Sequence, residues 1–242
     1  MKITILTLFP EMYSGFLSNS IIKRAIEADK VEFKIVNIRD YSDDPHKRVD
    51  DTPYGGGAGM LMRVDVVDKA LKANKGDNGY VLLTSAKGKT FDQKKARELA
   101  LKDELVIIAG HYEGIDYRIE EKTDELISIG DYILTGGELP SMVISDAITR
   151  LLDGVISDDS TVEESFENSL LEYPQYTRPY EYEGKSVPDV LLSGHHDNIR
   201  KYRLKESLRM TYLHRPDLLE KVELDKEKKE LLEQIISEYV NK

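Results

Sequence analysis

The sequence predicts an α/β domain with a mostly parallel central sheet, followed by a small all-helical domain. In the first part of the chain, short and continuously apolar segments alternate with helical patterns. This alternation is typical of a parallel sheet covered by helices on both faces. A polar, acidic stretch begins at Asp153, and the segments beyond Pro188 have helical patterns only. A length of 242 residues leaves room for one large domain and a smaller one.

Each expected strand is a short run of apolar, often β-branched residues that ends at a turn or a charged segment. These runs occupy residues 2–8, 31–38, 80–85, 104–110 and 124–130. The helices expected among them cover residues 20–29, 64–73, 91–100 and 141–152, with a short helix near 115–122. Pro140 suits the first turn of the 141–152 helix, because that turn needs no amide donor. Residues 39–63 are rich in Asp, Pro and Gly and are predicted to form a loop.

In the second part of the chain, helices are expected over residues 195–212, 215–222 and 225–239. We place the boundary of the α/β domain after residue 159. Residues 160–188 then form an interdomain linker, and residues 189–242 form the helical domain.

The composition indicates a cytoplasmic protein. The chain has no cysteine, which excludes disulfides and thiolate metal sites. Its N-terminal apolar run is short and has no small-residue cleavage site, so we expect no signal peptide. No segment reaches the roughly 18 apolar residues of a membrane span, so no membrane partner is expected. The net charge of −11 argues against broad coating of nucleic acid.

One segment departs from this acidic composition. Residues 195–215, here named the basic segment, hold six Lys or Arg residues against Asp197 and Glu206, a local net charge of +4. Such a segment suits a local contact with a polyanion such as RNA. A solvated helix face explains the same charges equally well.

The common nucleotide-binding and metal-binding motifs are absent from the sequence. The segment after the first expected strand does not have the G-x-G-x-x-G pattern of dinucleotide-binding domains. A phosphate-binding P-loop before Lys89 would need glycine at position 83, which is Leu83. The five histidines have no spacing typical of metal ligands, so we predict no metal site.

Three glycine-bearing loops each follow an expected strand, at residues 84–88, 110–114 and 130–140. In an open parallel sheet, ligands bind beyond the carboxyl ends of the strands. Glycine lets backbone N–H and C=O groups approach a ligand closely, and these loops carry few charges. The three loops therefore predict a pocket for one flat ligand without phosphates, such as an adenine group. Ordinary turn chemistry is the alternative for each loop taken alone.

Six segments form a distinctive set: TLFPEM, VDDTPYGGGAGM, GHYEGID, SIGDYILTGGELP, YPQYTRP and VPDVLLSGHH. In order and spacing they resemble the bacterial tRNA (guanine-N1)-methyltransferases of the TrmD family, over nearly the whole chain. The resemblance implies the SPOUT class of fold, in which the C-terminal edge of the sheet is tied into a trefoil knot that cradles S-adenosylmethionine. It also implies a homodimer with active sites at the subunit interface. The expected reaction methylates N1 of the guanosine immediately 3′ of the tRNA anticodon, at position 37.

The resemblance also implies which residues bind the methyl donor and the tRNA. Matched position by position, the donor-binding residues are Leu83, Ser85, Gly110, Tyr112, Glu113, Ile129, Gly130, Asp131, Tyr132, Ile133, Leu134, Gly136, Gly137 and Pro140. The residues expected to contact tRNA are Asp50, Arg178, His196, Arg200, Lys201 and Arg203. A requirement for Mg²⁺ is left open, because no motif bears on it.

The reaction itself sets a minimum set of catalytic groups. N1 of guanine carries a proton whose loss places negative charge on O6, so the site needs a base near N1 and a cation near O6. Arg150 matches the family's catalytic arginine, although a plain helix-end charge also explains it. The aspartate that acts as the base in the family corresponds here to Glu164, which precedes Ser165 and Phe166. The extra methylene moves the carboxylate by up to about 1.5 Å, and a displacement of about 1 Å can cost on the order of a hundredfold in rate.

Three further positions depart from the family pattern. Ala86 and Lys87 stand where relatives often have proline and glutamine, and His195 stands where asparagine is usual. Lys87 would alter the edge of the donor pocket, and His195 would alter the contact with RNA.

Two other functions stay open at this point. One is a SPOUT methyltransferase that modifies a different base or a ribose, against which the VDDTPYGGGAGM and YPQYTRP segments argue. The other is a non-catalytic RNA-binding protein that kept the pocket and lost the base, which the glutamate at position 164 suggests.

Overall fold

The computed structural model describes residues 1–157, 165–166 and 169–240. The chain divides into two compact units, Met1–Ser157 and Asp158–Lys242, and each unit is described by itself. No helix in the described ranges is long and apolar enough to cross a membrane.

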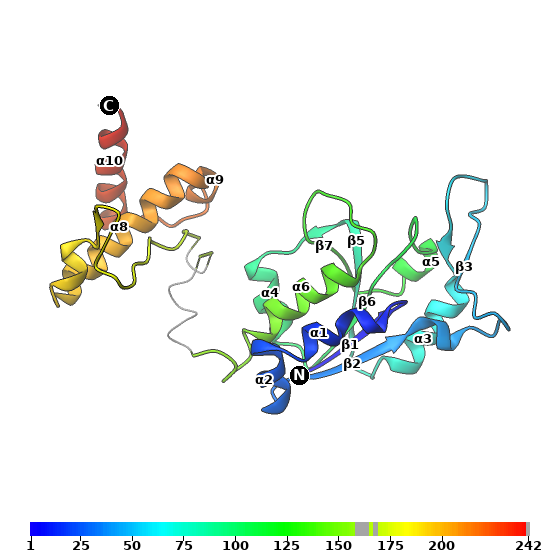
Figure 1. The fold of residues 1–242 in the computed structure, drawn as a ribbon. Helices are drawn as coiled ribbons and strands as arrows, with labels where there is room; N and C mark the ends of the chain where they lie inside the picture. Colours follow the sequence, from blue (N-terminus) through cyan, green and yellow to red (C-terminus); the bar gives the residue numbers. More distant parts are fainter. Residues whose placement is uncertain (158–164, 167–168, 241–242) are drawn as a thin grey trace. The chain divides into compact units, whose positions relative to one another are not determined.

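The first unit is built on a five-stranded sheet with strand order β2-β1-β6-β5-β7 (Figure 1). The strands are β1 Lys2–Thr7, β2 Glu32–Asn37, β5 Tyr80–Thr90, β6 Glu104–Ile108 and β7 Glu125–Ser128. All neighbouring pairs in this sheet are parallel. The prediction of a mostly parallel sheet from five apolar runs is therefore confirmed.

Helices cover both faces of the sheet, because the strand side chains alternate between two apolar clusters. Ile3 and Ile5 of β1 belong to one cluster, whereas Leu6 of the same strand belongs to the other. The helices of this unit are α1 Ser14–Leu17, α2 Ser20–Glu27, α3 Val64–Asn74, α4 Gln93–Ala100, α5 Tyr117–Glu120 and α6 Glu138–Thr149. Helices α3 and α5 pack into the Leu6 cluster, and helices α2, α4 and α6 pack into the cluster of Ile3 and Ile5.

Two boundaries differ from the sequence prediction. The segment 84–88, expected to be a loop, lies within strand β5, which continues to Thr90 with a register shift between Thr84 and Lys89. Gly88 permits this, because an added Cβ would lie 2.5 Å from the carbonyl carbon of Leu126 in the neighbouring strand β7. The segment was expected to be a loop because it holds a glycine and follows the apolar run, but its polar residues belong to a partly exposed stretch of the strand. Helix α6 begins at Glu138, two residues before Pro140.

The region expected to be a single loop contains short regular elements. A 3₁₀ helix, η2, covers Ile38–Tyr41, and another, η1, covers Pro10–Tyr13 earlier in the chain. The two-residue strands β3 Asp50–Asp51 and β4 Leu61–Met62 pair antiparallel, so the glycine-rich segment between them is the tip of a hairpin.

The second unit contains the helices α8 His196–His214, α9 Pro216–Leu219 and α10 Lys226–Val240. A small core holds Leu170, Leu208 and Ile235 together. The segment expected to be a plain linker contains an antiparallel hairpin of β8 Glu181–Tyr182 and β9 Lys185–Ser186, followed by the 3₁₀ helix η3 Asp189–Leu192.

Candidate functional site

A cavity of about 340 Å³ lies at the carboxyl ends of β6 and β7, beside residues 83–87 within β5. Segments 83–87, 110–115 and 127–140 contribute to its lining, so the three predicted glycine-bearing segments do converge on one pocket. All the residues expected to bind the donor line it except Asp131, whose side chain is exposed. The size is typical of small-molecule sites.

Backbone contacts hold two of these segments together. The N–H of Gly137 donates a hydrogen bond of 2.7 Å to the carbonyl of Gly110, and His111 forms an isolated antiparallel bridge with Gly136. A side chain at position 137 has no space, since its Cβ would lie 2.7 Å from both Cα of Ala109 and N of Gly110. Glycine is therefore required at this point by close approach of two loops.

The loop between β7 and α6 turns sharply at Gly130. This residue has a φ of +143°, a conformation that favours glycine. Ser128 fixes the turn through its hydroxyl, which accepts from the N–H of Gly130 at 3.2 Å and donates to its carbonyl at 3.1 Å. Beyond the turn, Tyr132, Ile133 and Leu134 line the cavity although all three are largely exposed. The loop thus offers apolar side chains and backbone groups to a ligand.

A buried polar cluster that sequence reasoning missed lies under the pocket. Glu138, only 2% exposed, accepts a hydrogen bond of 2.8 Å from Oγ1 of Thr7. Its other oxygen lies 3.6 Å from Nδ1 of His111. Nearby, the hydroxyls of Tyr13 and Ser141 lie 2.7 Å apart. Burial, with the negative charge of Glu138 in addition, raises the pKa of Tyr13 well above its ordinary value. The signal in the sequence was an acid at the start of an otherwise apolar helix.

An ion pair borders the same cavity. Nζ of Lys87 lies 2.5 Å from Oε1 of Glu120, and it lies 5.6 Å from the centroid of the Tyr117 ring. Lys87 and Glu120 both line the cavity. The expectation that Lys87 lies at the pocket edge agrees with this position.

The upstream glycine-rich segment is attached to the rim of the pocket by its backbone. Met62 donates to the carbonyl of Gly114 at 2.9 Å, and Glu113 donates to the carbonyl of Met60 at 3.1 Å. Leu61, which lies between Met60 and Met62 in the chain, lines the cavity. Asp50, expected to contact RNA, pairs with Met62 across the hairpin. The glycine-rich hairpin between β3 and β4 therefore lies beside the glycine-bearing loop 110–114 at the rim of the cavity.

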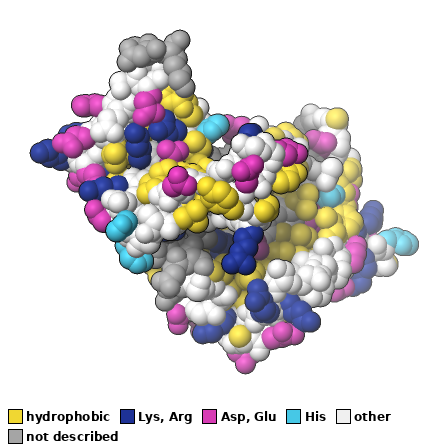
Figure 2. Space-filling view, turned by 60° about the vertical axis from the view of Figure 1, so that its left-hand side comes forward, with side chains coloured by type: hydrophobic (Ala, Val, Ile, Leu, Met, Phe, Trp, Pro, Cys, Tyr) yellow, Lys and Arg dark blue, Asp and Glu magenta, His cyan; other side chains and the backbone are white. Residues whose placement is uncertain are grey.

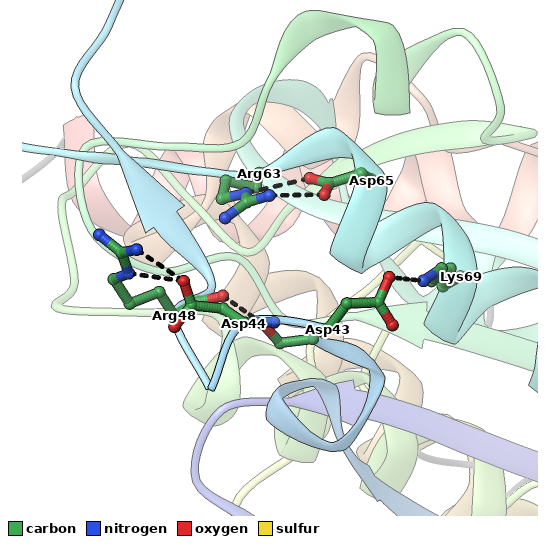
Figure 3. A network of polar contacts seen from close by, with 7 residues as sticks. Asp43, Asp44, Arg48, Arg63, Asp65 and Lys69 are labelled. Carbon is green, nitrogen blue, oxygen red and sulfur yellow. Dashed lines mark hydrogen bonds and ion pairs between the residues drawn. The ribbon is translucent and has the colours of Figure 1, made fainter. Parts of the chain in front are cut away.

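Ion pairs surround the base of this hairpin (Figure 3). Arg48 hydrogen bonds to Asp44, which holds the pKa of that carboxyl down at about 2. Arg63 bonds to Asp65 through two nitrogens, at 3.1 and 2.7 Å. Lys69 pairs with Asp43. The pairs Lys69–Asp43 and Arg63–Asp65 tie the chain before and after the hairpin to helix α3. The bond between Arg48 and Asp44 closes the turn that precedes the hairpin.

The two expected catalytic residues are not seen together. Arg150 is the C-terminal cap of α6, whereas Glu164 lies outside the described residues. Gly137, at the pocket, is the N-terminal cap of the same helix. At a rise of about 1.5 Å per residue, Arg150 lies about 20 Å along the helix from Gly137 and about 15 Å from Pro140, and both of these residues line the cavity.

The residues expected to bind tRNA in the second unit lie in two places. Arg178 lines a cavity of about 320 Å³ together with Tyr176, Tyr180 and Tyr182. The others lie on α8, which begins at His196.

Carboxylates neutralise much of the basic segment. Arg200 bonds to Glu227 of α10 through both terminal nitrogens, at 3.0 and 2.8 Å, and Lys201 lies 3.1 Å from Asp197. Arg203 lies over the ring of Tyr173, with Cζ 4.8 Å from the centroid. In Figure 2, Lys and Arg side chains are interspersed with Asp and Glu on the visible face. The local charge of +4 therefore overstates the basic character of the folded surface.

Within the described ranges, no three His, Asp or Glu side chains gather in a way that would hold a metal ion.

Comparison with known proteins places the chain in one family. Residues 1–221 match the family model described as tRNA (Guanine-1)-methyltransferase TrmD. The chain is 56% identical to the tRNA (guanine-N(1)-)-methyltransferase of Syntrophomonas wolfei, over 100% of both chains. It is 51% identical to the protein of that name from Dictyoglomus turgidum, over 98% of both chains. The Clostridium botulinum protein of the same name is 56% identical, over 96% of this chain and 97% of its own.

Proposed function

The chain belongs to the tRNA (guanine-1)-methyltransferase TrmD family, and from this premise we propose how its residues carry out the reaction. It is an enzyme that transfers a methyl group from S-adenosylmethionine to N1 of a guanosine in tRNA, the one at position 37 immediately 3′ of the anticodon. The observation that carries the proposed roles is the convergence of three glycine-bearing segments on one cavity at the carboxyl edge of the sheet.

The cavity suits the adenosine part of the donor. The backbone between Gly130 and Gly136 lines the cavity and would offer donors and acceptors to the edge of a flat base, and Ile129 and Leu134 would offer apolar contacts to its faces. We assign donor binding to the residues expected from the sequence, with Asp131 as the one residue off the cavity wall. When bound, the donor supplies an activated methyl group on a sulfonium.

We further propose that these loops are tied as a trefoil knot, as in the SPOUT class. Its support is the pair of contacts that hold residues 110–111 against residues 136–137, since a chain passing through a loop needs close backbone approach. Gly137, where the backbones meet without space for a side chain, would be the tightest point.

The position of Arg150 supports the proposal of a homodimer with shared active sites. In one subunit this residue lies about 15–20 Å along α6 from Pro140 and Gly137 at the pocket, a separation that argues against its acting on a guanine in the same subunit's site. We propose that Arg150 acts on the site of the partner subunit, where its charge would stabilise the negative charge forming on O6.

Mixing two inactive variants tests this arrangement. A Gly137→Val variant lacks the pocket, and an Arg150→Ala variant lacks the cation. If each site uses the pocket of one subunit and Arg150 of the other, a heterodimer of the two variants has one intact site. Random exchange of subunits in an equal mixture then restores roughly a quarter of the wild-type sites. No recovery, despite subunit exchange seen by native mass spectrometry, would place both groups in one subunit.

We propose Glu164 as the base that removes the proton from N1. A carboxylate suits this role because it accepts a proton and bears no positive charge that would oppose the approach of the sulfonium. Its position in the chain immediately before Ser165 and Phe166 supports the assignment.

The second unit and the glycine-rich hairpin would hold the tRNA. We propose that residues 1–159 form the donor-binding domain, residues 160–188 the linker and residues 189–242 the tRNA-binding domain. Asp50 and its hairpin, attached to the pocket rim, would face the guanosine. Arg178 lies among exposed tyrosines, a combination that suits stacking on unpaired bases. His196, Arg200, Lys201 and Arg203 would contact the backbone. We place the enzyme in the cytoplasm, where its substrate is made.

The test is methylation of unmodified tRNA transcripts with either G or A at position 37. We expect incorporation only into the G transcript, with 1-methylguanosine as the nucleoside product. A different methylated nucleoside would favour another SPOUT methyltransferase, and donor binding without incorporation would favour a non-catalytic RNA-binding protein. The same assay with and without EDTA measures a Mg²⁺ requirement.

A further inference from the structure

The rim of the donor pocket carries an ion pair that the roles above do not use. Among the described residues that line the cavity, Lys87 is the only lysine or arginine, and Glu113 and Glu120 are the only acids. The ion pair between Lys87 and Glu120 joins strand β5 to the end of α5 at this rim. The wall formed by residues 129–137 is uncharged where it lines the cavity. The pocket therefore has a neutral wall and a charged rim.

The methyl donor is divided in the same way. Its adenosine part is flat and uncharged, which matches the neutral wall. Its methionine part ends in an α-ammonium and an α-carboxylate on one carbon, a closely spaced pair of opposite charges. Binding such a group favours an anion and a cation that are also close together, since charge-assisted hydrogen bonds are the strong ones.

We propose that Lys87 and Glu120 form a subsite for the amino-acid end of the donor. Lys87 binds the α-carboxylate, and Glu120 binds the α-ammonium. This inference rests on the proposed function, because it needs the adenosine part to lie against the neutral wall. Lys87 departs from the family pattern, and in this proposal it lets the pocket recognise the amino-acid end of the donor as well as the adenosine part.

The burial of the two side chains supports this exchange. The side chain of Glu120 is 14% exposed and is held in place on α5, whereas that of Lys87 is 59% exposed. A lysine has a flexible stem and three rotatable donors, so it can turn from Glu120 to a ligand carboxylate nearby. Because the lysine of this pair is mostly in solvent, it can leave Glu120 at a modest cost, and the α-ammonium of the ligand then takes its place beside the carboxylate. In the complex, one ion pair is replaced by two.

Calorimetry with two ligands tests the proposal. Both are 5′-thioethers of adenosine, and they differ only in the group that the sulfur carries. S-adenosylhomocysteine carries the complete amino-acid group, whereas 5′-methylthioadenosine lacks it, and neither donates a methyl group here. We expect Lys87→Gln and Glu120→Gln each to weaken binding of S-adenosylhomocysteine by roughly 10- to 100-fold, the range for a lost hydrogen bond to a charged group. Binding of methylthioadenosine should change by less than about twofold, since the wall that binds adenosine is untouched.

Lys89→Gln is the matched control, because Lys89 is exposed on the same strand and does not line the cavity. It should leave both affinities unchanged. Glu113→Gln tests the rival acid on the rim. Thermal melting of each variant should match that of the wild type, which separates loss of the subsite from loss of folding.

The outcomes distinguish this proposal from the one on which it rests. If Lys87→Gln binds S-adenosylhomocysteine as tightly as the wild type, the subsite is overturned while the adenosine pocket stands. If Glu113→Gln weakens binding and Glu120→Gln does not, the assignment of Glu120 is overturned. If the wild type binds neither ligand, the proposed donor pocket fails, and the subsite fails with it.

Discussion

Nδ1 of His111 lies 3.6 Å from one carboxylate oxygen of Glu138, while Thr7 donates a hydrogen bond of 2.8 Å to the other. The three side chains connect the loop after β6, the start of α6 and the end of β1. Gly136 lies between His111 and Glu138, and an added Cβ there would lie 3.0 Å from Cε1 of His111. Behind the cavity wall formed by His111 and Gly136 there is therefore a buried polar cluster built around one carboxylate.

Replacing this carboxylate should cost stability. In Glu138→Ala, the buried hydroxyl of Thr7 loses its acceptor, which costs about 1–3 kcal/mol. Glu138→Gln keeps an amide oxygen for Thr7 and has an N–H that can donate to Nδ1 of His111, so it should lose less. Urea unfolding of both variants measures the difference. Equal stability of the two would mean that the hydrogen bond from Thr7 does not matter.

Adding one methyl group at Gly137 should abolish donor binding. In Gly137→Ala the new Cβ meets backbone atoms of the segment directly after β6, at 2.7 Å from Cα of Ala109, and backbone cannot turn aside as a side chain can. The two loops must separate, and the pocket loses its shape. Calorimetry with S-adenosylmethionine measures the affinity. Gly15→Ala is the control, since nothing lies within 4 Å of its added Cβ. Unchanged affinity in the Gly137 variant would remove the pocket assignment.

The sequence was sufficient to predict the sheet and the position of the pocket, because both follow from local patterns. Apolar runs such as 104–110 identify buried strands wherever they occur, and the loops after parallel strands meet at one edge. Segment 84–88 was misread because its polar side chains gave no sign that Gly88 would bring it against β7.

Contacts between distant segments could not be predicted in this way. The approach of Glu138 to Thr7 joins residues far apart in the sequence, and no motif marks it. The charge of the basic segment could be counted from the sequence, but the carboxylates from other parts of the chain that pair with it could not be predicted. Helix α10 returns along α8 and places Glu227 and Glu238 beside its cations, a tertiary arrangement that composition does not contain.

Acid should weaken the contact between α8 and α10. Hydrogen bonds from Arg209 and Lys205 lower the pKa of Glu238 from 4.5 to about 2 in the folded protein. A carboxyl with a lowered pKa stabilises the folded state above its unfolded pKa, and this contribution is lost as the pH falls through the folded pKa. The loss should therefore occur between pH 4.5 and about 2. Thermal melting followed by circular dichroism across this range measures it.

Glu238→Gln is the comparison for this titration. The variant should be less stable at neutral pH, and its stability should depend less on pH below 4.5, the ordinary value for the carboxyl. A pH dependence identical to that of the wild type would show that other carboxyls cause the acid transition.

Removing the Glu227 carboxylate from Arg200, which keeps its bond to Asp197, should strengthen tRNA binding if this arginine contacts the phosphate backbone. Glu227 now occupies both terminal nitrogens of Arg200. Glu227→Gln removes the competing charge and should raise tRNA affinity, whereas Arg200→Gln should lower it and reduce the salt dependence by about one phosphate contact. Filter binding at several salt concentrations measures both. If neither variant changes the salt dependence, the basic segment is a solvated surface.

Glu164 is where the chain and its family disagree, and exchanging its carboxylate for an amide tests the mechanism most directly. Glu164→Gln keeps the shape and loses the proton acceptor, so single-turnover methylation should fall by roughly 10²- to 10⁴-fold. Donor affinity should stay the same, because the pocket lies in the first unit. Glu164→Asp restores the family's side chain and should remain active, with a rate that differs because the surrounding linker is matched to glutamate.

The neighbouring acid provides the control that fixes the register. Glu163 has the same carboxylate one position earlier, so Glu163→Gln should leave the single-turnover rate within about twofold if Glu164 is the base. Loss of activity in Glu163→Gln alone would move the base by one residue. If both amide variants keep the wild-type rate, neither carboxylate removes the proton from N1. The role must then belong to another group or to water, and the extra methylene at position 164 would have no catalytic consequence.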